Sequence, residues 1–155
     1  MKEIKLTQGK TTLCDNEDYE ELNKYKWYTQ KNRNKYYAVR AKYFSGVQKI
    51  ISMHNIIMKT PKGMETDHVN GLTLDNRKSN LRICTHSENS MNRIKQSNNK
   101  SGFKGISWSK DNKKWRATIQ LNYKKIHLGY FSDKEWAYAA YCTAATKYHK
   151  EFAHF

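Results

Sequence analysis

Residues 67–89 read DHVNGLTLDNRKSNLRICTHSEN, and how this stretch is interpreted decides the fold. An Asp-His pair opens it, and several asparagines follow. Asparagine at this density is typical of turns and helix caps, because its short side chain bonds to nearby backbone groups. The same residue types can also supply oxygen ligands for a cation and an imidazole that accepts a proton. The stretch therefore either caps turns or holds a metal ion against a phosphate.

The composition favours a polyanionic partner. The 155 residues include 29 Lys and Arg against 14 Asp and Glu, a net charge of +15. Such a balance points to nucleic acid before a membrane, with solubility alone as the bland explanation. Hydrophobic residues make up 37%, and aromatic residues supply much of that area. Two or three small cores fit this composition better than one large core.

Cysteine usage excludes several classes of protein. Cys14, Cys84 and Cys142 are widely separated, so neither a disulfide framework nor a structural zinc site is expected. Cys84 and His86 are two soft-metal donors without partners, and the role of His86 stays open. The N-terminus lacks an apolar signal region, and no segment approaches a membrane span. We expect a soluble, intracellular protein with no membrane partner.

The first third of the chain is predicted to consist of strands and turns. EIKLTQ and KTTLC flank a Gly-Lys turn, and KYYAVRAKY and QKIIS flank Ser45-Gly46. A small aromatic core is expected for this sheet, with stacking on bases as the alternative. The aromatic residues concerned are Trp27, Tyr28, Tyr36, Tyr37 and Tyr43.

The middle of the chain predicts a ββα unit after a short helix at MHNIIMK. Strand METDHV, strand LRIC and helix SENSMNR are its parts. Adjacent residues of a strand point to opposite sides, so one member of the Asp67-His68 pair can face a metal while the other faces a water. Mg²⁺ needs only one or two protein ligands beside phosphate oxygens. Asn89, on the helix, is expected to reach back toward Asp67.

Residues 54–93 resemble an HNH endonuclease motif of the phage and intron homing type. His68 matches the first histidine, Asn80 the middle asparagine of Asn-Leu, and Asn89 the last position. The resemblance implies a ββα-metal finger in which His68 is the general base and Asp67 and Asn89 bind a divalent metal, Mg²⁺ or alternatively Mn²⁺. It gives Asn80 a structural role across the loop. His54 lies in a run that resembles the segment before the motif, and its role stays open between core and phosphate contact.

The last third predicts three strands and one helix. FKGISWS, KWRATIQL and KKIHLGYF are separated by short turns, and the second alternates apolar with polar residues. SDKE reads as a capping box, with Ser132 as the N-cap, before the Ala-rich helix WAYAAYCTAATKYH. The face expected to pack on the sheet carries residues near helical spacing, with small residues that allow close packing: Trp136, Ala140, Thr143, Ala144 and Lys147. The polar face of the sheet is then left open, without exposed aromatic residues, and Trp108 and Trp115 are expected in the core.

Residues 102–155 resemble the APETALA/ethylene-response-factor DNA-binding domain of plants. Gly105, Leu128, Gly129 and the helix alanines carry the resemblance. It implies a sheet that enters the major groove of double-stranded DNA. Plant members carry arginines where this chain has Ser, Gln and Lys, so their GC-rich target is not implied here. The DNA-binding residues expected are Lys104, Ser107, Ser109, Thr118, Gln120, Lys125 and His127 for bases, and Lys110, Lys114, Arg116 and Lys124 for phosphates.

These inferences combine into one hypothesis, an α+β site-specific DNA endonuclease that depends on a metal. Its regions would be an N-terminal β-rich segment (1–53), the HNH motif (54–93), a linker (94–101) and the C-terminal domain (102–155). A non-catalytic DNA-binding regulator is the alternative, and an RNA-binding module is a third. Target sequence, nicking or double-strand cleavage, monomer or homodimer, and host all stay open; the pairing of domains points to a phage or bacterium.

Overall fold

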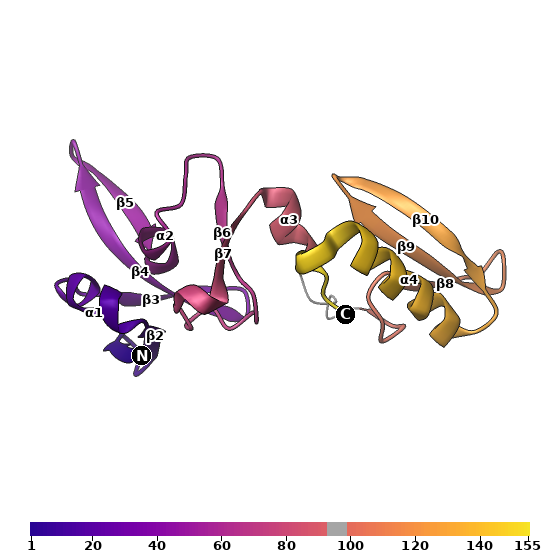
Figure 1. Cartoon of the computed structure of the whole chain (residues 1–155), viewed down its shortest axis with the longest axis horizontal. Coiled ribbons are helices and arrows are strands. Elements are labelled where there is room, and N and C mark those ends of the chain that lie inside the picture. The colour runs from indigo at the N-terminus through magenta and orange to yellow at the C-terminus, as the bar shows by residue number, and fades with distance from the viewer. Residues whose placement is uncertain (93–98) are drawn as a thin grey trace. The chain divides into compact units, whose positions relative to one another are not determined.

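The computed structural model describes residues 1–92 and 99–155. It has an α+β fold built from small antiparallel sheets, which confirms the predicted class. The chain divides into two compact units, Met1–Thr85 and His86–Phe155, and each is considered by itself (Figure 1). Most of the predicted linker, 94–101, lies outside the described residues.

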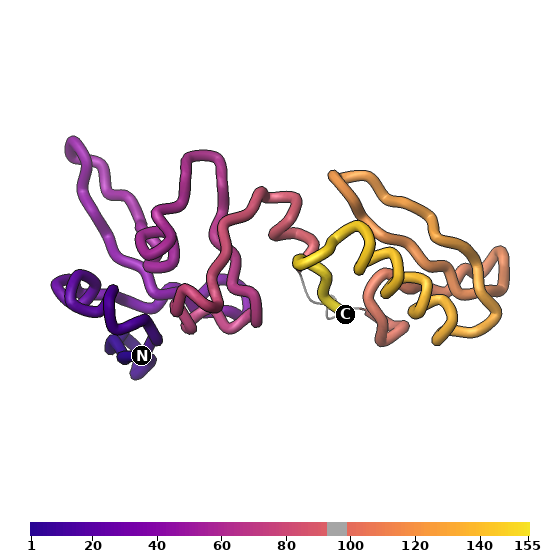
Figure 2. The backbone as a smooth tube through the Cα atoms, viewed as in Figure 1, coloured from indigo at the N-terminus to yellow at the C-terminus, as the bar shows by residue number. Residues whose placement is uncertain are grey.

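The first unit contains three separate sheets. β1 pairs with β2, β4 lies between β3 and β5, and β6 pairs with β7, all antiparallel. The chain path that joins them can be followed in Figure 2. The elements are β1 (Lys2–Lys5), β2 (Thr11–Cys14), α1 (Asn16–Asn23), β3 (Tyr28–Asn32), β4 (Lys35–Phe44), β5 (Val47–Ser52), α2 (Met53–Ile57), β6 (Glu65–His68), the 3-10 turn η1 (Lys78–Asn80) and β7 (Leu81–Cys84).

Helix α1 was not predicted, because the first third was interpreted as strands and turns alone. Only Leu22 of this helix is buried, so its sequence carries no apolar stripe. Glu17 and Asp18 lie in its first turn, where negative charge is favourable to the helix dipole. The core that Leu22 joins includes Trp27, whose ring nitrogen donates to the Leu22 carbonyl at 2.8 Å. Tyr43, expected in that core, is instead 68% exposed.

Strand β2 also holds the loop between β6 and β7. The Leu13 backbone N–H donates to the Leu74 carbonyl at 2.9 Å, and the Asn76 N–H donates to the Leu13 carbonyl at 2.9 Å. These two bonds make a short parallel bridge between residues about sixty positions apart along the chain. The N-terminal hairpin therefore sets the path of the loop that follows His68.

The second unit confirms the predicted sheet backed by one helix. Strand β9 lies between β8 and β10, and α4 contacts all three strands. Asp133, not Ser132, is the N-cap of α4, because its carboxylate accepts from two backbone N–H groups of the first turn. The elements are α3 (His86–Met91), β8 (Ile106–Ser109), β9 (Lys114–Leu121), β10 (Lys124–Phe131), α4 (Lys134–His149) and the 3-10 turn η2 (Lys150–Phe152).

The face of α4 that packs on the sheet differs in part from the predicted one: Ala144 is buried as expected, but Thr143 and Lys147 are exposed. Trp136 was expected on this face and is 71% exposed, whereas Tyr141 is buried. The small residues beside Tyr141 allow close packing on the sheet. Gly105 is part of this contact: a side chain there would lie 2.4 Å from the Tyr141 ring and 2.5 Å from the Thr118 carbonyl, and its φ is +76°. The close approach and the positive φ both require glycine.

Candidate functional site

His68 is the last residue of β6 and is buried, not a surface histidine. Its side chain is 4% exposed, and its ring lies edge-on to His54 with 5.0 Å between centroids. Tyr37, on β4, contacts both rings, at 6.0 Å from His54 and 6.3 Å from His68. The packing of three rings on one another restricts the orientation of the His68 imidazole.

A chain of hydrogen bonds runs from His68 to the N-terminal hairpin. The Leu74 carbonyl can only accept, so the Thr12 hydroxyl donates to it at 2.7 Å. The Thr12 oxygen then accepts from the Asn76 amide nitrogen at 2.8 Å, which leaves the Asn76 amide oxygen facing His68 Nε2 at 3.0 Å. Each bond fixes the direction of the next, so Nε2 of His68 carries the proton and Nδ1 is the basic nitrogen.

The protonation of both histidines follows from their burial. Burial lowers the pKa of His68, and the hydrogen bond to Asn76 and the charge of Asp67 oppose this shift. Burial also lowers the pKa of His54, to about 3, with a further contribution from His68. A lowered pKa keeps His68 neutral near pH 7, which is the state in which an imidazole accepts a proton.

Asp67 precedes His68 and forms an ion pair within the β6–β7 ladder. Arg82, directly opposite on β7, donates to Asp67 Oδ2 from Nε at 3.0 Å and from Nη2 at 2.8 Å. Within residues 1–92 and 99–155, no group of three or more His, Cys, Asp and Glu side chains could hold a metal ion. The role of Asp67 as a metal ligand stays a prediction, and Arg82 partly neutralises the charge of its carboxylate.

Asn80 joins the two ends of the loop between β6 and β7. Its amide oxygen accepts from the Asn70 backbone N–H at 3.0 Å, and its amide nitrogen donates to the Asp75 carbonyl at 2.8 Å. Its own carbonyl accepts from Val69 at 2.8 Å. These contacts accord with the structural role expected for Asn80. Asn89 lies on α3 and belongs to the second unit, so its expected pairing with Asp67 stays a prediction.

In the second unit, polar residues follow one face of the sheet. Ala117 and Ile119 are buried against α4, and the alternate residues of β9 point away from it. Cross-strand pairing aligns Arg116 with Ser107, and His127 with Thr118. All of the expected DNA-binding residues are exposed or half-buried: Lys104, Ser107, Ser109, Lys110, Lys114, Arg116, Thr118, Gln120, Lys124, Lys125 and His127.

Three details of this surface differ from expectation. Lys104 precedes β8, and its ammonium donates to the carbonyls of Met91 at 2.7 Å and His154 at 3.3 Å. Burial lowers the pKa of Lys104 to about 8. Because its ammonium already binds two backbone carbonyls, Lys104 is a structural residue of this unit rather than a candidate DNA contact. Trp108 is 50% exposed and not in the core. Tyr130 is 42% exposed beside His127, so the sheet does carry an exposed aromatic residue.

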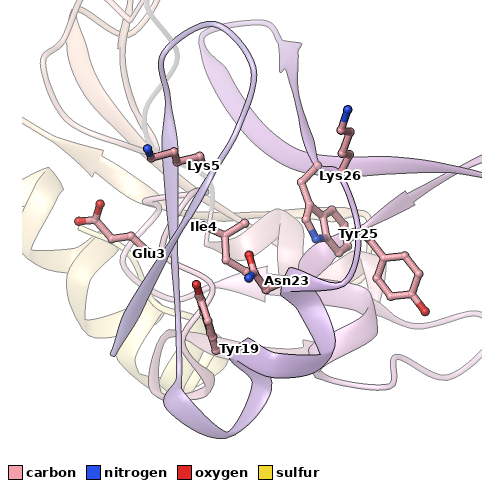
Figure 3. Close-up of a pocket in the computed structure, with 8 residues that line it drawn as sticks. Glu3, Ile4, Lys5, Tyr19, Asn23, Tyr25 and Lys26 are labelled. Carbon is pink, nitrogen blue, oxygen red and sulfur yellow. The ribbon is translucent and has the colours of Figure 1, made fainter.

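A pocket of about 380 Å³ lies in the first unit, between β1 and α1 (Figure 3). Tyr19, Tyr25 and Trp27 form its aromatic walls, and Lys5 and Lys26 line its rim. The residues that line it include neither Asp67 nor His68. This pocket is separate from the histidine site.

The comparison that bears on the site concerns the β6–β7 segment and α3. Residues 59–91 match the HNH endonuclease family. The match includes the four residues expected from the resemblance, Asp67, His68, Asn80 and Asn89, and the expected plant-type C-terminal domain stays a prediction. It covers a minor part of the chain.

Two further comparisons complete this result. The chain is similar to Protein 3.8 of Escherichia phage T7, with 42% identity over 65 residues. The alignment covers 42% of this chain, and the chain spans about half the length of that relative, 54%. No solved structure is significantly similar to the chain. Among the described residues, no helix combines the length and apolar character that crossing a bilayer requires.

Sequence reasoning missed the residues that orient His68. Asn76 is one of the asparagines of residues 67–89 for which turns and caps were one alternative, yet its side chain is fully buried, as is that of Thr12. Their partners lie far apart along the chain, so no local spacing reveals the contact. Thr12 is a polar residue at a buried position of β2. Its polar side chain was the one signal that could have indicated a buried hydrogen bond.

Proposed function

We propose that the chain is a metal-dependent, site-specific DNA endonuclease of the HNH type. The observation that carries the proposal is the directed hydrogen-bond chain that ends at His68, inside the segment that matches the HNH endonuclease family. A turn or cap residue needs no such arrangement. A neutral imidazole with a defined basic nitrogen is what a general base for phosphodiester hydrolysis requires.

In the proposed reaction, His68 accepts a proton from the attacking water at Nδ1. Asn76 keeps the other proton on Nε2 and holds the plane of the ring. His54 and Tyr37 pack on the imidazole and restrict its rotation. Asn80 holds the loop after β6, so the end of the strand that carries His68 keeps its position.

Asp67 fits the needs of Mg²⁺ or Mn²⁺ as one hard oxygen ligand. Such an ion keeps several waters and takes substrate phosphate oxygens, so a cluster of three protein ligands is unnecessary. When bound, a divalent ion would stabilise the charge that develops on the leaving 3′ oxygen. Arg82 would share the Asp67 carboxylate with the ion, and Asn89 remains the second ligand expected from the sequence.

The C-terminal unit is proposed to bind the major groove through the open face of β8–β10. A three-stranded sheet with a polar face can present side chains to base edges. Gln120 is suited to adenine, while Lys114 and Arg116 are suited to phosphates, which position a protein without specifying sequence. Substrate DNA of phage or bacterial origin is the partner that this proposal implies.

Conversion of supercoiled plasmid tests the nuclease proposal. Wild type, His68→Ala and the control His86→Ala are incubated with Mg²⁺ or with EDTA, on DNA from the gene's own neighbourhood. Relaxed or linear product is expected only with metal, and His68→Ala should reduce the rate about 10²–10⁴-fold while His86→Ala does not. Product topology also separates nicking from double-strand cleavage.

One result would replace the proposal with the alternative, a non-catalytic DNA-binding regulator. That result is salt-sensitive binding to duplex DNA with no cleavage under any divalent metal. The ion pair between Asp67 and Arg82 is the observation that favours this alternative, since it occupies one oxygen of the metal-binding carboxylate. Cleavage that is unaffected by His68→Ala would contradict the assigned general base instead.

A further inference from the structure

The hairpin tip, residues 42–50, is exposed on both faces. Nine consecutive residues at the end of β4 and the start of β5 are exposed, whereas Val39, nearer the start of β4, is fully buried. In Figure 1 the tip extends beyond α2, with no other element of the first unit beside it. Tyr43, Val47 and Ile50 are 68%, 60% and 48% exposed. A two-stranded ribbon that presents this much apolar surface to solvent is suited to contact with a partner.

The charge of the surrounding segment selects the kind of partner. No Asp or Glu occurs between Glu21 and Glu65. Among the ion pairs of the described residues, none involves a cation of β3–β5 or its turns. These cations are Lys31, Arg33, Lys35, Arg40, Lys42 and Lys49. Cations that lack acidic partners are available for phosphates.

Two lysines of the tip lie opposite each other in the strand register, and this position favours an anion between them. Lys42 lies directly opposite Lys49, and both ammonium groups lie over the Phe44 ring, at 4.8 and 5.6 Å from its centroid. Like charges directly opposite one another destabilise a strand pair. A phosphate bound by both lysines would remove that repulsion.

Strand β4 connects this tip to the histidine site. Tyr37 contacts His68, and the charge of Lys35 acts on the same imidazole. Lys42 lies five residues beyond Tyr37, a rise of about 16 Å at ~3.3 Å per residue. This length corresponds to about five base-pair steps of B-DNA at ~3.4 Å each. A two-stranded ribbon fits the major groove, which is about 12 Å wide.

We propose that the hairpin tip is a second DNA-contacting element, which enters the major groove about five base pairs from the phosphate attacked at His68. Lys42 and Lys49 bind backbone phosphates, and the apolar residues of the tip contact the groove. The position relative to the cleaved phosphate rests on the proposed nuclease function. The contact with DNA does not, because it follows from the exposure and charge of the tip alone.

Binding of a labelled random-sequence duplex in EDTA tests the contact without cleavage. The full-length variant Lys42→Gln/Lys49→Gln is compared with the control Lys2→Gln/Lys24→Gln, which removes the same charge from cations that already pair with Glu20 and Glu21. Each phosphate contact contributes about 0.9 to the slope of log affinity against log salt, so the first variant should lose about 1.8. Between about 50 and 200 mM salt, wild type should then lose about 12-fold more affinity than this variant.

Three results would overturn the proposal, and they differ from one another. Equal slopes for the variant and the control would show that only net charge matters. A variant that keeps wild-type DNA binding but self-associates would assign Lys42 and Lys49 to protection of the β5 edge. Absence of wild-type binding to any duplex would remove both this proposal and the proposed function, whereas binding without cleavage would remove the latter alone.

A second variant and a footprint complete the test. Lys42→Arg/Lys49→Arg retains the charge and should keep the wild-type slope of log affinity against log salt. If substitution at these positions instead damaged folding, this variant would also lose slope. Hydroxyl-radical footprinting is then done in EDTA on an intact duplex that contains the cleavage site. Lys42→Gln/Lys49→Gln should lose protection about five base pairs from the phosphate that wild type cleaves. Loss of protection at the cleaved phosphate itself would contradict the assigned position.

Discussion

Replacement of Thr12 by valine tests whether the hydrogen-bond chain sets the chemistry of His68. Valine has nearly the shape of threonine but no hydroxyl, so the packing of β2 is preserved. The Leu74 carbonyl keeps its bond from the Leu13 N–H. The group that loses its oxygen acceptor is the Asn76 amide nitrogen, which is fully buried. Only the weak bond from this nitrogen to the Met53 sulfur, at 3.6 Å, then opposes a turn of the amide nitrogen toward His68.

The expected magnitudes follow from the bonds that are lost. A buried donor without an acceptor costs about 1–3 kcal/mol, which for a unit of this size lowers Tm by roughly 4–8 °C per kcal/mol. If the amide flips freely, about half of the His68 side chains lose the productive tautomer, in which Nε2 carries the proton and Nδ1 is basic. If the flipped state is favoured by one hydrogen bond, ~1 kcal/mol, the productive tautomer falls about sixfold. Cleavage by Thr12→Val should therefore fall by about twofold to tenfold, well below the ~10²–10⁴ expected for loss of the base.

The assay combines three measurements on Thr12→Val, with Thr12→Ser as the control that keeps the hydroxyl. Ring ¹⁵N shifts report which nitrogen of His68 carries the proton, single-turnover cleavage reports the rate, and thermal unfolding reports stability. We expect the Nδ1–H tautomer to appear in Thr12→Val alone. If Thr12→Val keeps the Nε2–H tautomer and yet loses activity, the role of the hydrogen-bond chain would be structural only. If Thr12→Ser is as damaged as Thr12→Val, the hydroxyl would not be the relevant group.

Three further predictions concern other parts of the chain. Gly105→Ala should destabilise the second unit by more than about 2 kcal/mol, measured by thermal unfolding, because a Cβ there would overlap backbone and a ring. Burial holds the pKa of His54 near 3 against 6.5 in the unfolded chain, so the unfolded state binds more protons between these values. The contribution of His54 to stability should thus be complete above about pH 6.5 and fall toward pH 3 by up to ~1.4 kcal/mol per pH unit. Urea unfolding of wild type and His54→Leu measures it: the variant should show a weaker pH dependence, and what remains is expected from His68, whose pKa burial also lowers. Lys104→Gln should lose stability with no change in the salt slope of DNA binding, whereas Arg116→Gln should lose about one unit of slope and little stability.

Local patterns were sufficient for the strands of the second unit and for recognising the central motif. KWRATIQL and KKIHLGYF coincide with β9 and β10, because alternation of apolar and polar residues depends only on neighbouring positions. The Asp67-His68 pair was likewise recognisable because both members are adjacent. The cap of α4 was misplaced by one residue, since Ser132 and Asp133 are both good N-caps and only the backbone geometry decides between them.

Features that depend on contacts distant in sequence could not be predicted. Helix α1 buries only Leu22, so its existence depends on the core that it joins and not on its own periodicity. Trp136 was placed on the buried face by its helical spacing from Ala140 and Ala144, but the helix is oriented by Tyr141, which lies against Gly105. The role of Asn76 depended on a hydroxyl at Thr12, and no pattern in the sequence joins those positions.

The N-terminal β-rich segment and the central motif depend on one another in the first unit. The segment that matches the HNH endonuclease family begins at residue 59, yet the proton on His68 is positioned through Asn76 and Thr12, and the Asn76 amide also contacts the Met53 sulfur. Tyr37, which packs on His68, belongs to the strand that also carries Lys42. A change in the N-terminal β-rich segment is thereby transmitted to the proposed base through two routes. One is the hydrogen-bond chain from β2, and the other is the ring contact from β4. If the hairpin tip binds DNA as proposed, the strand that positions the substrate is the same strand that restricts the catalytic imidazole, and residues 1–53 are part of the active site rather than an appendage to it.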